Sequence, residues 1–176
     1  YPMVSFVIPA YNEERLVSQC IASLFKCAAQ YPGYSEIIAV DDGSTDHAYE
    51  VAWVAIKENQ GRWPYVAGKV VRHMANLGKA EAVRTGVNKA MGEVIGLVDS
   101  DSWWNPSTLQ ELVTYINTDS KAAVTGYVHP SDGKEERNLY VILQQLEYSQ
   151  GLGIIRCAQA LGDAVLVIPG PIGLYK

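Results

Sequence analysis

The sequence predicts an α/β fold, in which a mostly parallel, Rossmann-like β-sheet carries helices on both faces. Two observations support this prediction. Short apolar runs rich in β-branched residues recur along the chain, and segments with a helical spacing of apolar residues separate them. Strands that alternate with helices in this way form right-handed crossover units, which build parallel sheets. No internal repeat or long linker interrupts the chain, so we expect a single domain over residues 1–176.

The predicted strands are short runs in which almost every residue is apolar. The three strongest runs are residues 4–8, 36–40 and 94–98. Runs of this kind are typical of strands that are buried on both faces of a parallel sheet. Weaker candidates are residues 66–72, 122–128 and 164–168.

The predicted helices are identified by apolar residues that lie three or four positions apart. In chain order the five stripes are Leu16, Cys20, Leu24 and Cys27; Ala48, Val51, Ala52 and Ala55; Ala80, Val83, Val87 and Ala90; Leu109, Leu112, Val113 and Ile116; and Leu139, Ile142, Leu143 and Leu146. Asn105 is predicted to cap the fourth helix, with Pro106 in its first turn. The fifth helix is predicted to end near Gly151 and Gly153.

The composition is that of an ordinary globular protein, with 48% hydrophobic and 19% charged residues. This excludes a disordered tail, a collagen and a coiled coil. The net charge of −5 argues against a nucleic-acid partner, because a duplex-DNA binder normally carries a basic stripe. Three cysteines without paired spacing exclude a disulfide scaffold and a zinc knuckle.

The chain has no stretch of about 18 apolar residues, the length that a membrane-spanning helix needs. We therefore expect these residues to be soluble by themselves. The chain begins at Tyr1 and ends at Lys176, directly after an apolar run. Both ends suggest that it is part of a longer protein.

Acidic and amide side chains follow three of the predicted strands. Residues 9–14 read PAYNEE, residues 41–46 read DDGSTD and residues 99–101 read DSD. In an open α/β sheet, ligands bind outside the carboxyl ends of the strands. The sequence therefore predicts one site at this edge of the sheet.

Asp99 and Asp101 are candidate ligands of a divalent cation. Side chains two residues apart in extended backbone point to the same side, so two carboxylates can share one ion. Hard oxygen ligands of this kind fit Mg²⁺ or Mn²⁺. The alternative is that Asp99 caps a loop and Asp101 is solvated, but the second acidic loop nearby favours metal binding.

Asp42 is a candidate for nucleotide recognition, because a carboxylate at a strand end can accept an N–H from a nucleobase or a ribose hydroxyl. The neighbouring Ser44, Thr45 and Asp46 are predicted to form a turn that caps the next helix. Lys79 is predicted near the start of the third helix, where a cation and free backbone N–H groups favour a diphosphate. A solvated lysine is the alternative for that residue.

The histidines and tryptophans give weaker indications. His47, His73 and His129 show no ligand spacing and are predicted to be surface or loop residues. Trp103 and Trp104 could stack on a sugar face or pack a loop against the fourth helix, and packing is favoured.

Four ordered motifs resemble those of the family 2 glycosyltransferases, which have the GT-A fold. The motifs are residues 9–13, 41–46, 76–80 and 99–101. The later residues 144–148 and 168–175 resemble the processive branch of that family, which contains the cellulose, chitin, hyaluronan and poly-N-acetylglucosamine synthases.

The resemblance implies an inverting, metal-dependent glycosyltransferase that uses a nucleotide-diphosphate sugar, with a UDP-sugar favoured, and an acceptor hydroxyl. It implies that Mg²⁺ or Mn²⁺ binds the Asp-x-Asp motif at Asp101 and Asp99, and that residues 170–175 border the acceptor site. The implied donor-binding residues are Pro9, Ala10, Tyr11, Glu13, Asp42, Lys79, Asp99, Ser100 and Asp101.

No catalytic residue is assigned within the chain, because the resemblance places the catalytic base, an Asp, beyond Lys176. The implied partners are a nucleotide-sugar donor and a glycan or lipid-linked acceptor. The longer protein is expected at the cytoplasmic face of the cell membrane, in polysaccharide biosynthesis. Two alternatives stay open: a transferase to polyprenyl or dolichyl phosphate that uses GDP-mannose or UDP-glucose, and a non-catalytic nucleotide-sugar-binding module.

Overall fold

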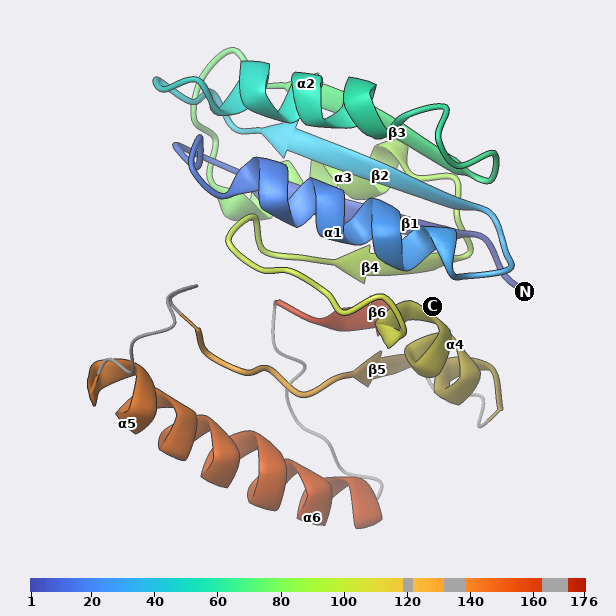
Figure 1. The fold of residues 1–176 in the computed structure, drawn as a ribbon, viewed down its shortest axis with the longest axis vertical. Coiled ribbons are helices and arrows are strands. Elements are labelled where there is room, and N and C mark those ends of the chain that lie inside the picture. Colours follow the sequence, from blue (N-terminus) through green and yellow to red (C-terminus); the bar gives the residue numbers. More distant parts are fainter. Residues whose placement is uncertain (119–121, 132–138, 163–170) are drawn as a thin grey trace.

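The computed structural model describes residues 1–118, 122–131, 139–162 and 171–176, and its strands form one six-stranded sheet. The strands are β1 (Val4–Ala10), β2 (Ser35–Asp41), β3 (Val66–Arg72), β4 (Val94–Leu97), β5 (Ala123–Thr125) and β6 (Gly173–Tyr175). Their order in the sheet is β3-β2-β1-β4-β6-β5 (Figure 1). β3, β2, β1 and β4 run parallel, whereas β6 is antiparallel to β4 and β5. The predicted, mostly parallel sheet is therefore confirmed.

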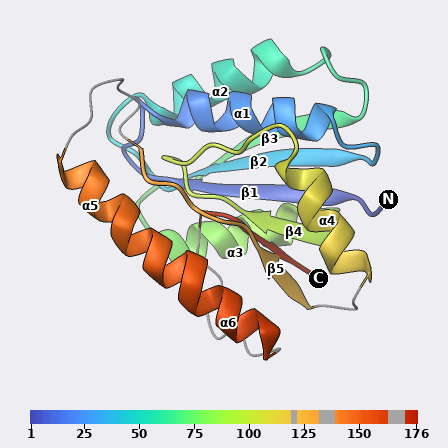
Figure 2. The same ribbon diagram turned by 60° about the horizontal axis from the view of Figure 1, so that its bottom comes forward.

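Helices cover both faces of this sheet, as predicted. The helices are α1 (Val17–Ala29), α2 (Ala48–Asn59), α3 (Lys79–Lys89), α4 (Thr108–Thr118), α5 (Leu139–Tyr148), the π-helix η1 (Ser149–Ile155) and α6 (Arg156–Leu161). α1 and α2 lie on one face of the sheet and α3 lies on the other (Figures 1 and 2). α4 packs against α1 and against β5 and β6. Within the described residues, no helix is long and apolar enough to cross a membrane.

The core lies between the sheet and the α1 side of the molecule. Every residue of β1 and of β2 is buried, which agrees with apolar runs covered on both faces. Cys20, Leu24 and Cys27 of the first predicted stripe are buried as well, and so are all four residues of the fourth stripe. Burying one such large side chain contributes about 1.5–3 kcal/mol relative to leaving it exposed.

One buried side chain within the predicted apolar strands is charged. Glu36 of β2 is 2% exposed, and its carboxylate accepts hydrogen bonds from Ser5 Oγ at 2.7 Å and from the Met91 N–H at 2.6 Å. Lys69 of β3 pairs with it at 2.9 Å. Burial raises the pKa of Glu36, but these partners outweigh burial and the net pKa lies below the ordinary value. A paired carboxylate is thereby accommodated near the start of β2.

The buried face of α3 differs from the predicted stripe. Ala82 and Gly86 are the buried residues of this helix, whereas Ala80 and Val87 are exposed. A Cβ on Gly86 would lie 2.2 Å from Val7 Cγ1 in β1, so only glycine permits this close approach of helix and sheet. Val83 and Ala90 of the predicted stripe are partly buried, and Ala90 packs against the core cluster that contains Ala82. Apolar spacing therefore predicted this face only in part, because the helix packs most closely through its smallest residues.

Three further element boundaries differ from prediction. α4 begins at Thr108, so Asn105 and Pro106 lie in the turn before it. The fifth α-helix, α5, ends at Tyr148, close to the predicted end, but the π-helix η1 and then α6 follow it without a break, which was not predicted. β6 was not predicted as a strand; its three residues pair with Ile95–Leu97 of β4. The predicted strand at residues 164–168 lies outside the described residues.

Candidate functional site

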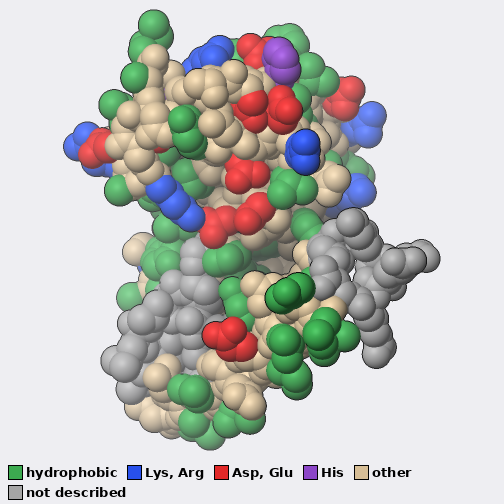
Figure 3. Space-filling view, turned by 90° about the vertical axis from the view of Figure 1, so that its left-hand side faces the viewer, with side chains coloured by type: hydrophobic (Ala, Val, Ile, Leu, Met, Phe, Trp, Pro, Cys, Tyr) green, Lys and Arg blue, Asp and Glu red, His purple; other side chains and the backbone are tan. Residues whose placement is uncertain are grey.

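The candidate site is a cleft at the carboxyl ends of β1, β2 and β4. β1 and β2 are neighbours, but the chain then returns from β3 to the other side of β1 to form β4. Such a switch point leaves a crevice beside the strand ends, where ligands bind in open α/β sheets. Acidic side chains gather on this face of the molecule, with lysine and arginine side chains beside them (Figure 3).

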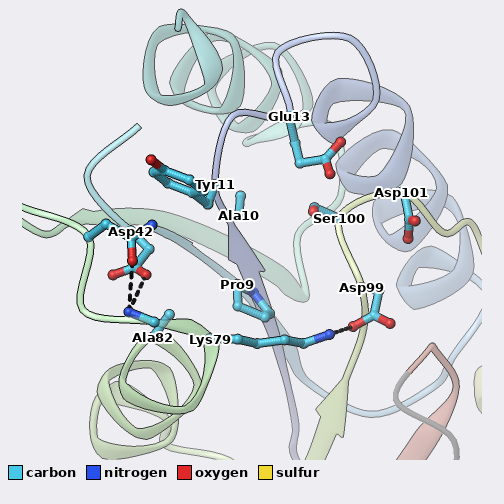
Figure 4. A pocket seen from close by; sticks show the side chains of 12 residues that line it. Pro9, Ala10, Tyr11, Glu13, Asp42, Lys79, Ala82, Asp99, Ser100 and Asp101 are labelled. Atoms are coloured by element: carbon cyan, nitrogen blue, oxygen red, sulfur yellow. Dashed lines mark hydrogen bonds and ion pairs between the residues drawn. The ribbon is translucent and has the colours of Figure 1, made fainter. Parts of the chain in front are cut away.

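All nine predicted donor-binding residues line this one cleft, which has a volume of about 300 Å³ (Figure 4). Asp42 and Asp101, which follow different strands, therefore share a cavity. Asn76, Gly78 and Ala82 complete the lining and were not among the predicted site residues. Asn76 and Gly78 belong to the motif at residues 76–80, which the sequence analysis identified. No sequence pattern indicated that Ala82 lies at the cleft.

The loops after β1 and β2 are tied together by Asn12. Its side-chain Oδ1 accepts the Thr45 N–H at 2.9 Å, and its own N–H donates to Ser44 Oγ at 3.0 Å. Asn12 has a φ of 56°, a left-handed conformation that asparagine tolerates better than most residues. Ser44 and Thr45 therefore hold the neighbouring loop and do not cap α2 as predicted. Asp46 does act at the helix start, where it accepts the Ala48 N–H.

Asp42 holds the loop that leads into α3. One carboxylate oxygen, Oδ1, accepts the Leu77 N–H at 3.0 Å, and the other, Oδ2, accepts the Gly78 N–H at 2.8 Å. Burial raises the pKa of Asp42, but these N–H donors and His73 outweigh it, so the pKa lies below its usual value. The carboxylate is thus held ionised at the edge of the cleft.

His73 does not line the cleft, but it contacts Asp42, which does, and sequence reasoning gave it no such role. It directly follows β3, its Nδ1 lies 2.7 Å from Asp42 Oδ1, and its side chain is 10% exposed. Its Nε2 lies 2.9 Å from Thr85 Oγ1 of α3. His73 is a loop residue, as predicted, but it is not an exposed one, and its contact with Asp42 was not predicted. His47 and His129 are exposed, as predicted.

The Asp99–Asp101 segment forms a turn and is not extended as predicted. The Ser102 N–H donates to the Asp99 carbonyl at 3.0 Å, and Ser100 between the two carboxylates is buried. Both aspartates nevertheless line the cleft. The Asp99 carboxylate pairs with Lys79 Nζ at 2.6 Å. The lysine side chain reaches from α3 past Pro9 to this carboxylate (Figure 4).

The cleft offers carboxylate oxygens for a cation, and its charges repel one another in the absence of one. Burial raises the pKa of Glu13, and the nearby Asp101 and Asp46 carboxylates raise it further. Among the described residues, no group of three or more acidic, histidine or cysteine side chains could hold a metal by itself. This donor set fits Mg²⁺ or Mn²⁺, because such ions use one or two carboxylates together with substrate phosphates.

A second, larger cleft of about 690 Å³ adjoins the first and shares Asp99 and Asp101 with it. Trp103 and Tyr127 contribute half-exposed aromatic rings to its wall, and Pro171 and Ile172 of the predicted acceptor segment also line it. Trp104 is buried against Phe6 and donates its indole N–H to the Pro171 carbonyl at 2.9 Å. Trp104 is therefore buried by packing, but its described ring partner is Phe6 of β1 and not the predicted fourth helix.

Comparison with known proteins places this geometry in a family. The description "Glycosyl transferase family 2" fits residues 5–174. This chain belongs to glycosyltransferase family 2. As a family 2 chain, it is 31% identical to a hyaluronan synthase of Streptococcus pyogenes over 98% of its own length and 40% of that protein. It is 29% identical to an N-acetylglucosaminyltransferase of Mesorhizobium japonicum, over its whole length and 40% of the relative.

Solved structures share the fold of this family 2 chain. A mannosyltransferase of Pyrobaculum calidifontis, in complex with GDP-Man and Mn²⁺, matches 99% of the chain and 44% of its own length with a TM-score of 0.76 and 24% identity. S. aureus TarS in complex with UDP matches 77% of the chain and 38% of its own length with a TM-score of 0.63 and 23% identity. The expected GT-A fold and the resemblance to the processive synthases are therefore confirmed. The chain spans about 40% of the curated relatives' length.

Proposed function

We propose that this chain is the donor-binding part of an inverting, metal-dependent glycosyltransferase that takes its sugar from a nucleotide-diphosphate sugar, with a UDP-sugar favoured. The observation that carries this proposal is the cleft itself. Four segments that are separated in sequence line one cavity of about 300 Å³. They contribute the carboxylates of Glu13, Asp42, Asp99 and Asp101 and the amine of Lys79. Membership of family 2 supports the same activity.

Different residues of the cleft bind different parts of the donor. Asp42 accepts a hydrogen bond from the nucleobase, with Pro9, Ala10 and Tyr11 beside it. Asp101 and Asp99 would hold Mg²⁺ or Mn²⁺ against the diphosphate, and the ion supplies charge that offsets the developing negative charge of the leaving group. The fold neighbour that contains GDP-Man also contains Mn²⁺. Lys79 adds a second positive charge at the same place, next to Asp99.

The acceptor enters through the second cleft in this proposal. Its hydroxyl oxygen forms a bond to the anomeric carbon of the donor sugar, while the bond from that carbon to the diphosphate oxygen breaks. The nucleoside diphosphate leaves with that electron pair, and a single displacement inverts the anomeric centre. The acceptor proton passes to a carboxylate base, which we place beyond Lys176.

The acceptor is proposed to be a glycan or a lipid-linked sugar. Half-exposed aromatic rings such as Trp103 and Tyr127 suit the apolar face of a sugar, and both line the second cleft. The whole protein is proposed to act in polysaccharide synthesis at the cytoplasmic face of the cell membrane. The similarity to a hyaluronan synthase supports this proposal.

Calorimetry with UDP in the presence and absence of Mn²⁺ tests the proposal. We expect UDP to bind the chain more tightly with Mn²⁺, and Asp101→Ala to remove most of that gain, a loss of tenfold or more. Glu81→Ala is the matched control, because Glu81 is a carboxylate of α3 that pairs with Arg84. Absence of UDP binding, or an affinity that Asp101→Ala leaves unchanged, would contradict the proposal.

A second candidate uses a guanosine donor and transfers the sugar to a lipid phosphate. The neighbour with a TM-score of 0.76 is a mannosyltransferase in complex with GDP-Man, which favours this candidate. Competition between UDP and GDP for the cleft separates the two donors. We expect UDP to bind more tightly.

A further inference from the structure

The carboxylate of Asp42 is almost fully occupied by the protein itself. Oδ1 receives the Leu77 N–H at 3.0 Å and lies 2.7 Å from His73 Nδ1. Oδ2 receives the Gly78 N–H at 2.8 Å. An ionised carboxylate has roughly four acceptor positions, two on each oxygen. Oδ1 is therefore saturated, and a single acceptor position remains on Oδ2.

This arrangement determines which ring nitrogen of His73 carries the hydrogen that faces Asp42. An ionised carboxylate can only accept hydrogen bonds, so Nδ1 of His73 must carry the hydrogen that faces Asp42. Thr85 Oγ1 lies 2.9 Å from Nε2 and fixes the ring from the other side. The His73 side chain is only 10% exposed, so its imidazole is fixed in place and donates its hydrogen bond to Asp42.

The loop that carries these partners is also fixed by its backbone. Gly43 follows Asp42 with a φ of +69°, and a Cβ there would lie 2.4 Å from the carbonyl carbon of Ala75. The backbone after His73 is thus packed directly against the backbone after Asp42. The number of acceptor positions that Asp42 presents to the cleft is therefore set by the fold and cannot easily adjust to a ligand.

We propose that His73 is a specificity-determining residue for the nucleobase: by saturating Oδ1 of Asp42, it leaves one acceptor and selects a base with a single ring N–H. The edge of uracil presents one N–H between two carbonyls. The edge of guanine presents a ring N–H beside an amino group, and a carboxylate that receives both donors uses one oxygen for each. Against Asp42, the second donor of guanine would be buried without a partner, which is unfavourable.

This inference rests on the proposed function, which places a nucleobase against Asp42. It adds a reason why the site would prefer a uridine to a guanosine nucleotide, and it assigns that preference to a residue that contacts Asp42 but does not line the cleft. His73 also positions Asp42, so its test must separate base selectivity from a general loss of order.

The experiment compares His73→Leu with His73→Asn, using calorimetry with UDP and with GDP in the presence of Mn²⁺. Both variants lose the imidazole and its contact to Thr85, but only asparagine can still donate an N–H to Asp42. We expect the wild-type chain to bind UDP at least tenfold more tightly than GDP. His73→Leu should lower this UDP-to-GDP ratio about tenfold, whereas His73→Asn should keep most of it. Thermal unfolding of each free variant reports any general loss of order.

Three results are decisive against this inference. If the wild-type chain binds GDP as tightly as UDP, Oδ1 saturation does not select the base. If His73→Leu and His73→Asn change the ratio equally, the donor to Oδ1 is not its cause. If the wild-type chain binds neither nucleotide, the proposed function itself is contradicted, and the two failures are thereby distinguished.

Discussion

The region of β1–β4 with α1–α4 differs sharply from the C-terminal helical segment, defined as residues 139–161 of α5, η1 and α6. In the first region, β1 and β2 are buried from end to end and α1 alone buries seven side chains. In the second, α5 has no buried residue, and Leu143 of its apolar stripe is 53% exposed. Figure 1 shows this segment as a separate rod beyond the edge of the sheet, and hydrophobic side chains lie on the surface in that part of Figure 3.

The two clefts differ in the same way, because they are built from these two regions to different extents. The first cleft is built from strand ends and from loops beside the core, and Asp42 and Asp99 have protein partners there. The second cleft takes part of its wall from Val141, Gln144 and Tyr148 of the helical segment. One contact of that segment is the 2.9 Å hydrogen bond from Gln145 Nε2 to the Pro130 carbonyl. The first cleft therefore depends on packing in the core more than this part of the second cleft does.

The largest expected effect comes from removing a large side chain from the core of the first region. Phe6 is fully buried in β1 and meets the ring of Trp104 edge-on at 5.2 Å. Phe6→Ala should lower the free energy of unfolding by about 3–5 kcal/mol. Leu143→Ala in the helical segment should change it by less than about 0.5 kcal/mol. Urea denaturation measures both, and equal losses would remove the contrast between the two regions.

Glycine substitutions should act in opposite directions in the two regions. Gly43→Ala forces a Cβ into a backbone with φ +69° and within 2.4 Å of Ala75, so we expect a loss of about 1–3 kcal/mol. A Cβ on Gly151 of η1 would meet nothing within 4 Å. Gly151→Ala should therefore stabilise the chain by up to about 1 kcal/mol, since glycine is unfavourable inside a helix. Thermal unfolding of the two variants compares them, and a neutral Gly43→Ala would show that the loop packing is not rigid.

The buried Glu36 should make the core region sensitive to acid. Its folded-state pKa lies below the ordinary value of 4.5, so the unfolded chain binds a proton first as pH falls. The stabilisation is complete above the unfolded pKa and is lost progressively as pH falls from there through the folded pKa. Urea denaturation between pH 3 and 7 should show this loss in the wild type and a flatter profile in Glu36→Gln. If the free energy of unfolding falls equally with pH in the wild type and in Glu36→Gln, Glu36 does not contribute to the acid sensitivity.

The smallest effect is expected on the outer surface of α3, within the core region itself. Arg84 pairs with Glu81 one helical turn away, and both side chains are largely exposed. Exposed ion pairs of this kind contribute little, so Arg84→Ala should cost less than about 0.5 kcal/mol. A larger loss in urea denaturation would show that sensitivity in this region extends beyond its buried side chains.

Local sequence patterns predicted the elements whose partners are themselves apolar. The stripes of α1 and α4 and the runs of β1 and β2 match buried residues, because one apolar face against another is all that those positions require. Strand ends followed by acidic residues predicted the edge of the sheet at which the first cleft lies. The same reasoning failed for Ala82 and Gly86 of α3, where a close approach to Val7 selects small residues, which carry no hydrophobic signal.

The sequence alone determined the alternation of strands and helices, the order of the four motifs and the edge of the sheet at which their side chains meet. Only the tertiary structure decided that His73 lies against Asp42, 31 positions away, and that Glu36 receives Ser5, Met91 and Lys69. The physical reason is the range of the interactions. Periodicity and turn chemistry act between near neighbours, whereas these hydrogen bonds arise from sheet register and helix docking, which bring distant residues together.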